Sequence, residues 1–257
     1  MTEYKKEEFT YAYYREFLSC LSEIYGFVNF TEGKKIISNS DQTVKDRQSL
    51  AILRHDIDMD LKPALTMSLI EKDMGLKATY FFMVTCPIYN VFSSIDAECV
   101  RQILSFGHHL GLHFDFPAYK DISPENLSFY IARECELLEK FFEHPVDAVS
   151  FHRWGSLKMN EITLENIPNT YERVFLDKFQ YFSDSRSRWA RGNPIKSEAF
   201  SKRENLHLLT HPIWWGDTVT APYERLTSLT AGNKLRAEQY LAANCDVWNE
   251  GIKAGNK

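Results

Sequence analysis

The sequence predicts an α/β fold in which helices cover a largely parallel sheet. Short apolar runs without polar alternation recur along the chain, which is typical of strands buried on both faces. Between these runs lie segments with helical periodicity, several of them preceded by a capping residue and followed by glycine. The 257 residues are enough for one large α/β domain or two small ones.

The alternation of elements begins near residue 50. The predicted strands are Leu50–Leu53, Ala78–Val84, His109–Phe114, Ala148–Phe151 and Leu206–Leu209, with strand-like pieces at Tyr171–Leu176 and Gln180–Ser183. The predicted helices are Tyr11–Phe27, Asp60–Gly75, Asp96–Gly107, Pro124–Phe142 and Ala231–Trp248. The polar stretch Thr31–Ser49 is expected to be a loop or a weak hairpin.

Composition excludes several classes of protein. The formal net charge of −5 makes nucleic-acid binding a poor expectation, because such binding depends on neutralising phosphates. Five scattered cysteines without a CxxC pair favour a reduced, cytoplasmic setting over a disulfide framework. The charged first residues predict no signal peptide, and no apolar run is long enough for a transmembrane helix. The oligomeric state is not predicted.

Chemically active side chains follow four of the predicted strands. Asp56 and Asp58 follow the first strand, His113 ends the third, His152 follows the fourth and His211 follows the last. Because active sites of parallel sheets form at the carboxyl ends of the strands, we expect these five side chains to lie together.

A divalent metal ion, with Zn²⁺ as the first choice, suits this set of side chains. A carboxylate and neutral imidazoles are good zinc ligands, and a catalytic zinc site uses three protein ligands and keeps one position open. Such a metal makes hydroxide available at neutral pH. A second carboxylate can then take a proton while a histidine protonates the leaving group.

The chain resembles the polysaccharide deacetylases of the NodB-homology, carbohydrate esterase family 4-like group, and in particular their divergent relatives from O-antigen and capsule gene clusters. The matching stretches are LRHDIDMD at Leu53–Asp60, KATYFF at Lys77–Phe82, GHHLGLHFD at Gly107–Asp115, VSFHRW at Val149–Trp154, YFSDSRSRW at Tyr181–Trp189 and LLTHPIWW at Leu208–Trp215. The resemblance implies a distorted (β/α) barrel with about seven strands. It also implies hydrolysis of an N-acetyl group on a sugar or glycan substrate during surface-polysaccharide synthesis.

The resemblance also assigns roles to residues. It implies a single deacetylase-like domain over residues 1–257, with a core at about 50–215 and the terminal helices as additions. Asp56 would be the general base and Asp58 a metal ligand. His113 would be the first histidine of the metal pair, and His211 the general acid beside the leaving nitrogen. The segment Asp184–Trp189 would orient side chains and shape the pocket.

The sequence departs from the family pattern in three places. Ile57 separates two aspartates that are usually adjacent, although alternation along a strand still puts both on one side. Pro117 occupies the position of the usual second metal histidine. The third ligand is therefore expected to be His152, which ends the next strand, with Asp115 as the second choice. The altered arginine-proline motif reads His152-Arg153-Trp154.

Further residues are candidates for binding the substrate. Arg54 and Arg186 could bind an anionic group of the substrate. Alternatively, these arginines could form a salt bridge to Asp184 and have no role in binding. Trp189 and either Trp214 or Trp215, which cannot both face one way, could stack on sugar rings, whereas aromatic side chains more often pack in the core. The full set of predicted substrate contacts is Arg54, Asp115, Asp184, Arg186, Trp189 and Trp214.

Two other functions fit parts of the sequence. His113-Phe114-Asp115 with a distant histidine matches the H-x-D…H triad of non-haem iron oxygenases, although those enzymes usually have antiparallel folds. The second alternative is a non-catalytic sugar-binding or assembly protein that has lost its full metal triad, which Pro117 suggests.

Overall fold

A computed structural model describes residues 8–39, 48–155, 158–164 and 166–255. Its chain forms two compact units, residues 1–219 and residues 220–257. The first unit contains all the strands and every predicted site residue. The second unit consists of α8 (Pro222–Asn244) and α9 (Asp246–Gly255).

A seven-stranded sheet forms the centre of the first unit, and each of its strand pairings is parallel. The strands are β1 (Tyr25–Phe27), β2 (Ser49–Ile57), β3 (Thr79–Phe82), β4 (His109–Asp115), β5 (Val146–His152), β6 (Gln180–Ser183) and β7 (Leu206–Thr210). Their order is β5-β4-β3-β2-β7-β6, and β1 pairs with the start of β2. This sheet and its surrounding helices confirm the predicted α/β class.

The two faces of the sheet pack into two separate clusters. On the inner face, Ile52 of β2, Phe81 of β3 and Ala148 of β5 join one buried cluster, although β2 and β5 are not neighbours in the sheet. The sheet is therefore curled around this cluster, in the manner of an open barrel. The opposite residues, such as Leu53, pack outward against the larger cluster beneath the helices.

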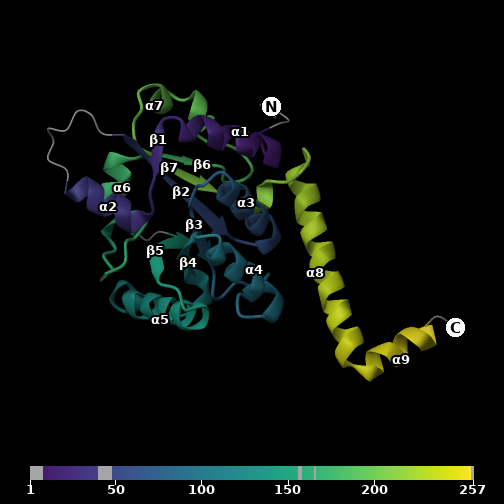
Figure 1. The fold of residues 1–257 in the computed structure, drawn as a ribbon. Coiled ribbons are helices and arrows are strands. Elements are labelled where there is room, and N and C mark those ends of the chain that lie inside the picture. Colours follow the sequence, from purple (N-terminus) through teal and green to yellow (C-terminus); the bar gives the residue numbers. More distant parts are fainter. Residues whose placement is uncertain (1–7, 40–47, 156–157, 165, 256–257) are drawn as a thin grey trace. The chain divides into compact units, whose positions relative to one another are not determined.

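The helices of the first unit cover the outer face and the ends of the sheet (Figure 1). They are α1 (Tyr11–Ser22), α2 (Phe30–Ser38), α3 (Leu61–Asp73), α4 (Ser94–Ser105), α5 (Pro124–Phe142), α6 (Arg173–Lys178) and α7 (Glu198–Ser201). Short 3-10 turns are η1 (Phe116–Ala118), η2 (Met159–Glu161), η3 (Pro194–Lys196) and η4 (Pro212–Trp214). The predicted bounds of α5 are confirmed, as is Asp60 as the N-cap of α3.

The N-terminal prediction was wrong in two respects. The expected helix Tyr11–Phe27 ends at Ser22, because Tyr25–Phe27 pairs with the first residues of β2 as a strand. The expected loop Thr31–Ser49 contains α2, whose start is fixed by a capping box between Asn29 and Glu32. Residues 40–47 of this stretch lie outside the described residues.

Later boundaries also differ from the prediction. The strand-like piece Tyr171–Leu176 is largely α6, which places Phe175 in the inner cluster. The expected cap Asp96 lies inside α4. The N-cap is Ser93, whose side chain accepts a hydrogen bond from the backbone amide of Asp96. The last predicted helix begins earlier, at Pro222, and is divided at Cys245.

A buried carboxylate joins the N-terminal helix to the sheet. The Glu71 side chain of α3 accepts hydrogen bonds from the hydroxyls of Tyr14 of α1 and Tyr80 of β3. His55 Nε2 of β2 lies 2.8 Å from Glu71 Oε1, and His55 Nδ1 lies 2.5 Å from Thr210 Oγ1 of β7. All of these side chains are buried, so the outer face of the sheet carries its own polar network.

None of the described residues of α8 is buried, and Tyr223, Tyr240 and Val247 are largely exposed. Within the described part of the chain, no helix is both long and apolar enough to cross a lipid bilayer.

We expect Gly111→Ala to destabilise the protein. A Cβ atom at Gly111 of β4 would lie 2.5 Å from Phe81 Cδ1 inside the curled sheet. Such overpacking costs about 1–3 kcal/mol in the free energy of unfolding, which urea denaturation measures. Gly232→Ala is the matched control, because nothing lies within 4 Å of a Cβ there and alanine favours a helix. Equal stabilities of the Gly111 variant and the wild type would contradict the tight packing.

Candidate active site

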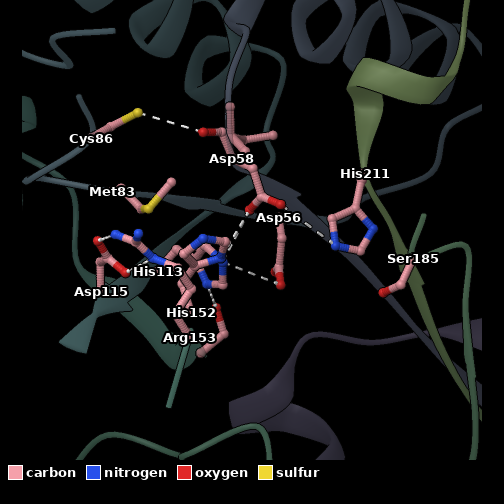
Figure 2. A network of polar contacts seen from close by, with 12 residues as sticks. Asp56, Asp58, Met83, Cys86, His113, Asp115, His152, Arg153, Ser185 and His211 are labelled. Carbon is pink, nitrogen blue, oxygen red and sulfur yellow. Dashed lines mark hydrogen bonds and ion pairs between the residues drawn. The ribbon is translucent and has the colours of Figure 1, made fainter. Parts of the chain in front are cut away.

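The ends of four strands bring the predicted catalytic residues together. Asp56 lies in β2, with Asp58 two residues later on the same side, and His113 lies in β4. His152 is the last residue of β5, and His211 directly follows β7. Figure 2 shows His211 on one side of the two aspartates and the other two histidines on the opposite side.

Asp58, His113 and His152 form a group that could hold a metal ion. One ligand atom from each lies within 4.8 Å of the others. His113 Nε2 is 3.2 Å from Asp58 Oδ1, and His152 Nδ1 is 3.6 Å from the same oxygen. Ligands about 2.0–2.1 Å from a tetrahedral zinc ion are about 3.3 Å apart, so the spacing fits.

The polar atoms of this group support the same interpretation. Asp58 Oδ1 is buried and has no well-formed hydrogen bond among the described residues, although His113 Nε2 lies 3.2 Å away. His113 Nδ1 lies 2.7 Å from the hydroxyl of Ser150, which orients the ring with Nε2 towards Asp58. Burial lowers the pKa of His152 and favours the neutral imidazole that a metal requires.

Arg54 fixes the candidate base, Asp56. The Arg54 guanidinium donates from Nε and Nη2 to the two carboxylate oxygens, at 2.8 and 2.7 Å. It lies against the rings of Phe81 and Tyr171, and its Nη1 donates to Thr170. Burial tends to raise the pKa of Asp56, but the charge of Arg54 prevails and holds it well below its usual value. Asp56 is therefore ionised at neutral pH.

Asp184 fixes the candidate acid, His211. The buried Asp184 carboxylate lies 2.6 Å from His211 Nδ1 and accepts hydrogen bonds from the His211 amide and from Trp215 Nε1. Burial tends to lower the pKa of His211, but the bond to Asp184 overcomes it and raises the pKa to about 9. His211 is thus a cation at neutral pH, with Nε2 3.9 Å from Asp58 Oδ2.

The predicted substrate contacts lie in different environments. Arg54 and Asp184 are fully buried and orient the candidate base and the candidate acid. Trp189 packs in the core against Phe9 and Phe17. Arg186 is exposed and Trp214 is half-buried. Among the described residues, neither Arg54 nor Arg186 forms the salt bridge to Asp184 that was the alternative to substrate binding.

Asp115 does not join the metal group. Its carboxylate is buried and receives a bidentate pair of hydrogen bonds from Arg153. An H-x-D…H iron site would require this carboxylate as a ligand together with His113, but it is paired with Arg153 and lies outside the candidate metal group, so the geometry does not favour the oxygenase alternative. His152, the first choice for the third ligand, belongs to the group that could hold a metal ion.

Sequence reasoning missed several residues that hold the site. Ser150 could have been found, because it precedes His152 by two residues and so shares its face of β5. Arg153 stood in a quoted motif, but its partner depends on the pairing of β4 with β5. Trp215 stood in a quoted motif as a candidate for stacking on a sugar, but its bond to Asp184 joins segments that are distant in the sequence.

The sequence matches no protein-family model and no curated protein. Among solved structures, it is similar to a CE4 family pseudoenzyme from Bacillus anthracis, at 14% identity and a TM-score of 0.41, over 72% of this chain and 60% of that one. It is also similar to the deacetylase PplD from Streptococcus pyogenes, at 14% identity and a TM-score of 0.44, over 84% of both chains.

A family 4 carbohydrate esterase from Bacillus anthracis is a third similar structure, at 13% identity and a TM-score of 0.41, over 86% of both chains. The chain spans only about three fifths of the length of the pseudoenzyme. At these identities and TM-scores the similarities carry no functional information.

We expect Arg54→Leu to be strongly destabilising, because it leaves the buried Asp56 carboxylate without its partner. The expected loss in the free energy of unfolding is about 3–5 kcal/mol. The double variant Arg54→Leu, Asp56→Leu should recover most of this loss, since no buried charge remains unpaired. Urea denaturation of the metal-free proteins measures both. Additive losses in the double variant would contradict the coupling of the two side chains.

We expect His211 to titrate at about pH 9 in the metal-free protein. Because this folded-state pKa lies above the unfolded value, the stabilisation is complete below about pH 6.5 and is lost as the pH rises through about 9. NMR of the imidazole resonances measures the pKa directly. Asp184→Asn should lower it, whereas Asp177→Asn on the exposed face of α6 should not. An unchanged pKa in the Asp184 variant would contradict the assigned cause.

Proposed function

We propose that the protein is a metal-dependent hydrolase that removes the N-acetyl group from a sugar. The observation that carries this proposal is the placement of Asp56 and His211 beside the group Asp58, His113 and His152. Asp56 is held ionised and His211 is held protonated. A hydrolase acting on an amide needs this combination of a base and an acid.

The residues fit a divalent cation. Asp58, His113 and His152 would hold it, and their donor set of one carboxylate and two imidazoles suits Zn²⁺. When bound, the cation would polarise the acyl oxygen of the substrate and lower the pKa of a water molecule. The unpartnered oxygen of Asp58 supports this assignment, because a buried carboxylate oxygen is rarely left without a donor.

The protein's own side chains would move the protons. Asp56 Oδ2 lies 3.7 Å from His113 Nε2, so a water beside the metal ligands is within its reach. Asp56 would take a proton from that water as its oxygen attacks the acetamide carbon. His211 would donate its proton to the leaving nitrogen as the C–N bond breaks. Acetate and a sugar amine are the products, and the pairs with Arg54 and Asp184 keep both groups oriented.

The biological setting is part of the same proposal. The motifs that resemble the divergent deacetylases of O-antigen and capsule clusters favour a role in surface-polysaccharide synthesis. All five cysteines are free thiols, which supports a cytoplasmic setting. The chain as a whole is proposed to act as one deacetylase domain carrying helical additions.

Two substitutions separate metal binding from proton transfer. Asp58→Ala should abolish both stoichiometric zinc and the release of acetate from N-acetylated sugars, because it removes a ligand. Asp56→Asn should retain zinc and lose about 10²–10⁴-fold in rate, because it removes only the base. Elemental analysis and an acetate assay measure the two properties.

Asp177→Ala, on the exposed face of α6, is the matched control and should retain both zinc and activity. Full hydrolysis by the Asp58 variant would overturn the proposed mechanism. Absence of metal from the wild type after zinc is added would overturn the metal assignment.

A further inference from the structure

We propose that Arg153 and Trp154 form a sugar-binding subsite beside the metal group. In this subsite the Trp154 ring stacks on a neutral sugar ring, and the guanidinium of Arg153 donates hydrogen bonds to its hydroxyl oxygens. The inference deepens the proposed function, because it assigns residues that recognise the sugar itself. The subsite can be tested separately from catalysis, because a sugar can bind to it without being hydrolysed.

Arg153 is held in place by a buried partner. Its Nε donates to Asp115 Oδ1 at 2.8 Å and its Nη2 donates to Asp115 Oδ2, while Asp115 is 1% exposed. The Arg153 side chain is nevertheless 53% exposed. Asp115 therefore engages one edge of the guanidinium, and no described residue engages Nη1. The two N–H groups of Nη1 and the second N–H of Nη2 stay available to a ligand.

The electrostatics of this pair indicate what it binds. Asp115 neutralises Arg153, so the pair as a whole attracts anions weakly. It still offers fixed donors at a partly exposed position, which suits the oxygen of a neutral hydroxyl group. Because Asp115 holds the guanidinium in one orientation, little side-chain entropy is lost when a ligand binds.

Trp154 provides the apolar surface that a sugar ring needs. Its ring lies 5.3 Å from that of Tyr171 and is 38% exposed. Tyr171 lies over the Arg54 guanidinium, which in turn holds Asp56. These contacts form a chain from the candidate base through Arg54 and Tyr171 to a partly exposed indole. An aromatic face of this kind packs against the C–H groups of a sugar.

The backbone turn directly after the candidate metal ligand His152 directs the two side chains to different neighbours. Arg153 adopts a left-handed conformation, with φ of 51°, directly after β5 ends. Arginine avoids this region, so the turn costs conformational energy and is retained at a functional position more readily than elsewhere. The turn directs Arg153 to Asp115 of β4, while Trp154 contacts Tyr171 beyond β5. Figure 2 shows the Arg153–Asp115 pair beside His113 and His152.

Sugar binding to the metal-free protein tests this subsite. The probes are N-acetylglucosamine, N-acetylgalactosamine and N,N′-diacetylchitobiose, with saturation-transfer NMR to detect binding and a titration to obtain Kd. The wild type should bind at least one probe. Arg153→Lys and Trp154→Ala should each weaken that binding by about tenfold, equivalent to about 1.4 kcal/mol. Lysine retains the charge that pairs with Asp115 but lacks the additional fork of donors.

Matched controls separate the subsite from general surface effects. Lys158→Gln changes an exposed cation in the same segment, and Phe129→Ala removes an aromatic ring that is 60% exposed on α5. Both variants should bind the sugar as the wild type does. Binding of none of the three probes by the wild type would overturn the inference, as would unchanged Kd values in the Arg153 and Trp154 variants.

A phosphorylated probe distinguishes a neutral sugar from an anion. N-Acetylglucosamine 1-phosphate should bind no more tightly than N-acetylglucosamine. An Arg153-dependent gain for the phosphate would make this an anion site and overturn the assignment. Zinc analysis of the same proteins keeps the two proposals apart. If the protein binds sugar through Arg153 and Trp154 but holds no zinc, the subsite is supported and the proposed metal-dependent hydrolase activity is overturned.

Discussion

The ion pair between Arg54 and Asp56 is the constraint on which the rest of the site depends. Both side chains lie inside the curled sheet, where an unpaired charge would be very costly. Their bidentate contact, together with Phe81, Tyr171 and Thr170, gives each charge a partner and a fixed direction. The inner face can therefore change within one strand from apolar packing at Ile52 to charged chemistry at Asp56.

The same principle recurs at the other groups of the site. Three further side chains with a proposed chemical role are oriented by a buried neighbour: His113 by Ser150, His211 by Asp184, and Arg153 by Asp115. None of these partners faces the ligand, so the positions of the reactive atoms are set before any substrate arrives. Such preorganisation is the main means by which proteins stabilise developing charge.

Local patterns in the sequence were sufficient to predict much of this arrangement. Apolar runs marked the strands, and the side chains that follow them were expected to meet because parallel strands share an edge. Alternation within β2 placed Asp56 and Asp58 on one side despite Ile57 between them. The position of His152 at the next strand end was enough to nominate it in place of Pro117. The Asn29–Glu32 capping box of α2 was also present in the sequence, but it was overlooked in a polar stretch.

Other features depend on pairings that no local pattern contains. The partner of Arg153 follows from the register of β4 and β5, and the bond from Trp215 to Asp184 requires β6 to lie beside β7. Arg54 was taken for a substrate contact because its charge was visible and its complete burial was not. The strand at Tyr25–Phe27 was predicted as the end of a helix, because the apolar residues before it have helical spacing and its pairing with β2 is not visible in the sequence.

The Glu71 network has a consequence for where this fold can be cut. Tyr14 of α1 donates to a carboxylate that also contacts Tyr80 and lies beside His55, the neighbour of Asp56 in β2. Removing the first helix would open an apolar surface and also strip a donor from a buried anion behind the catalytic strand. Helix α1 is thus tied to the sheet through this carboxylate, and a recombinant fragment without α1 would need a replacement for that hydroxyl.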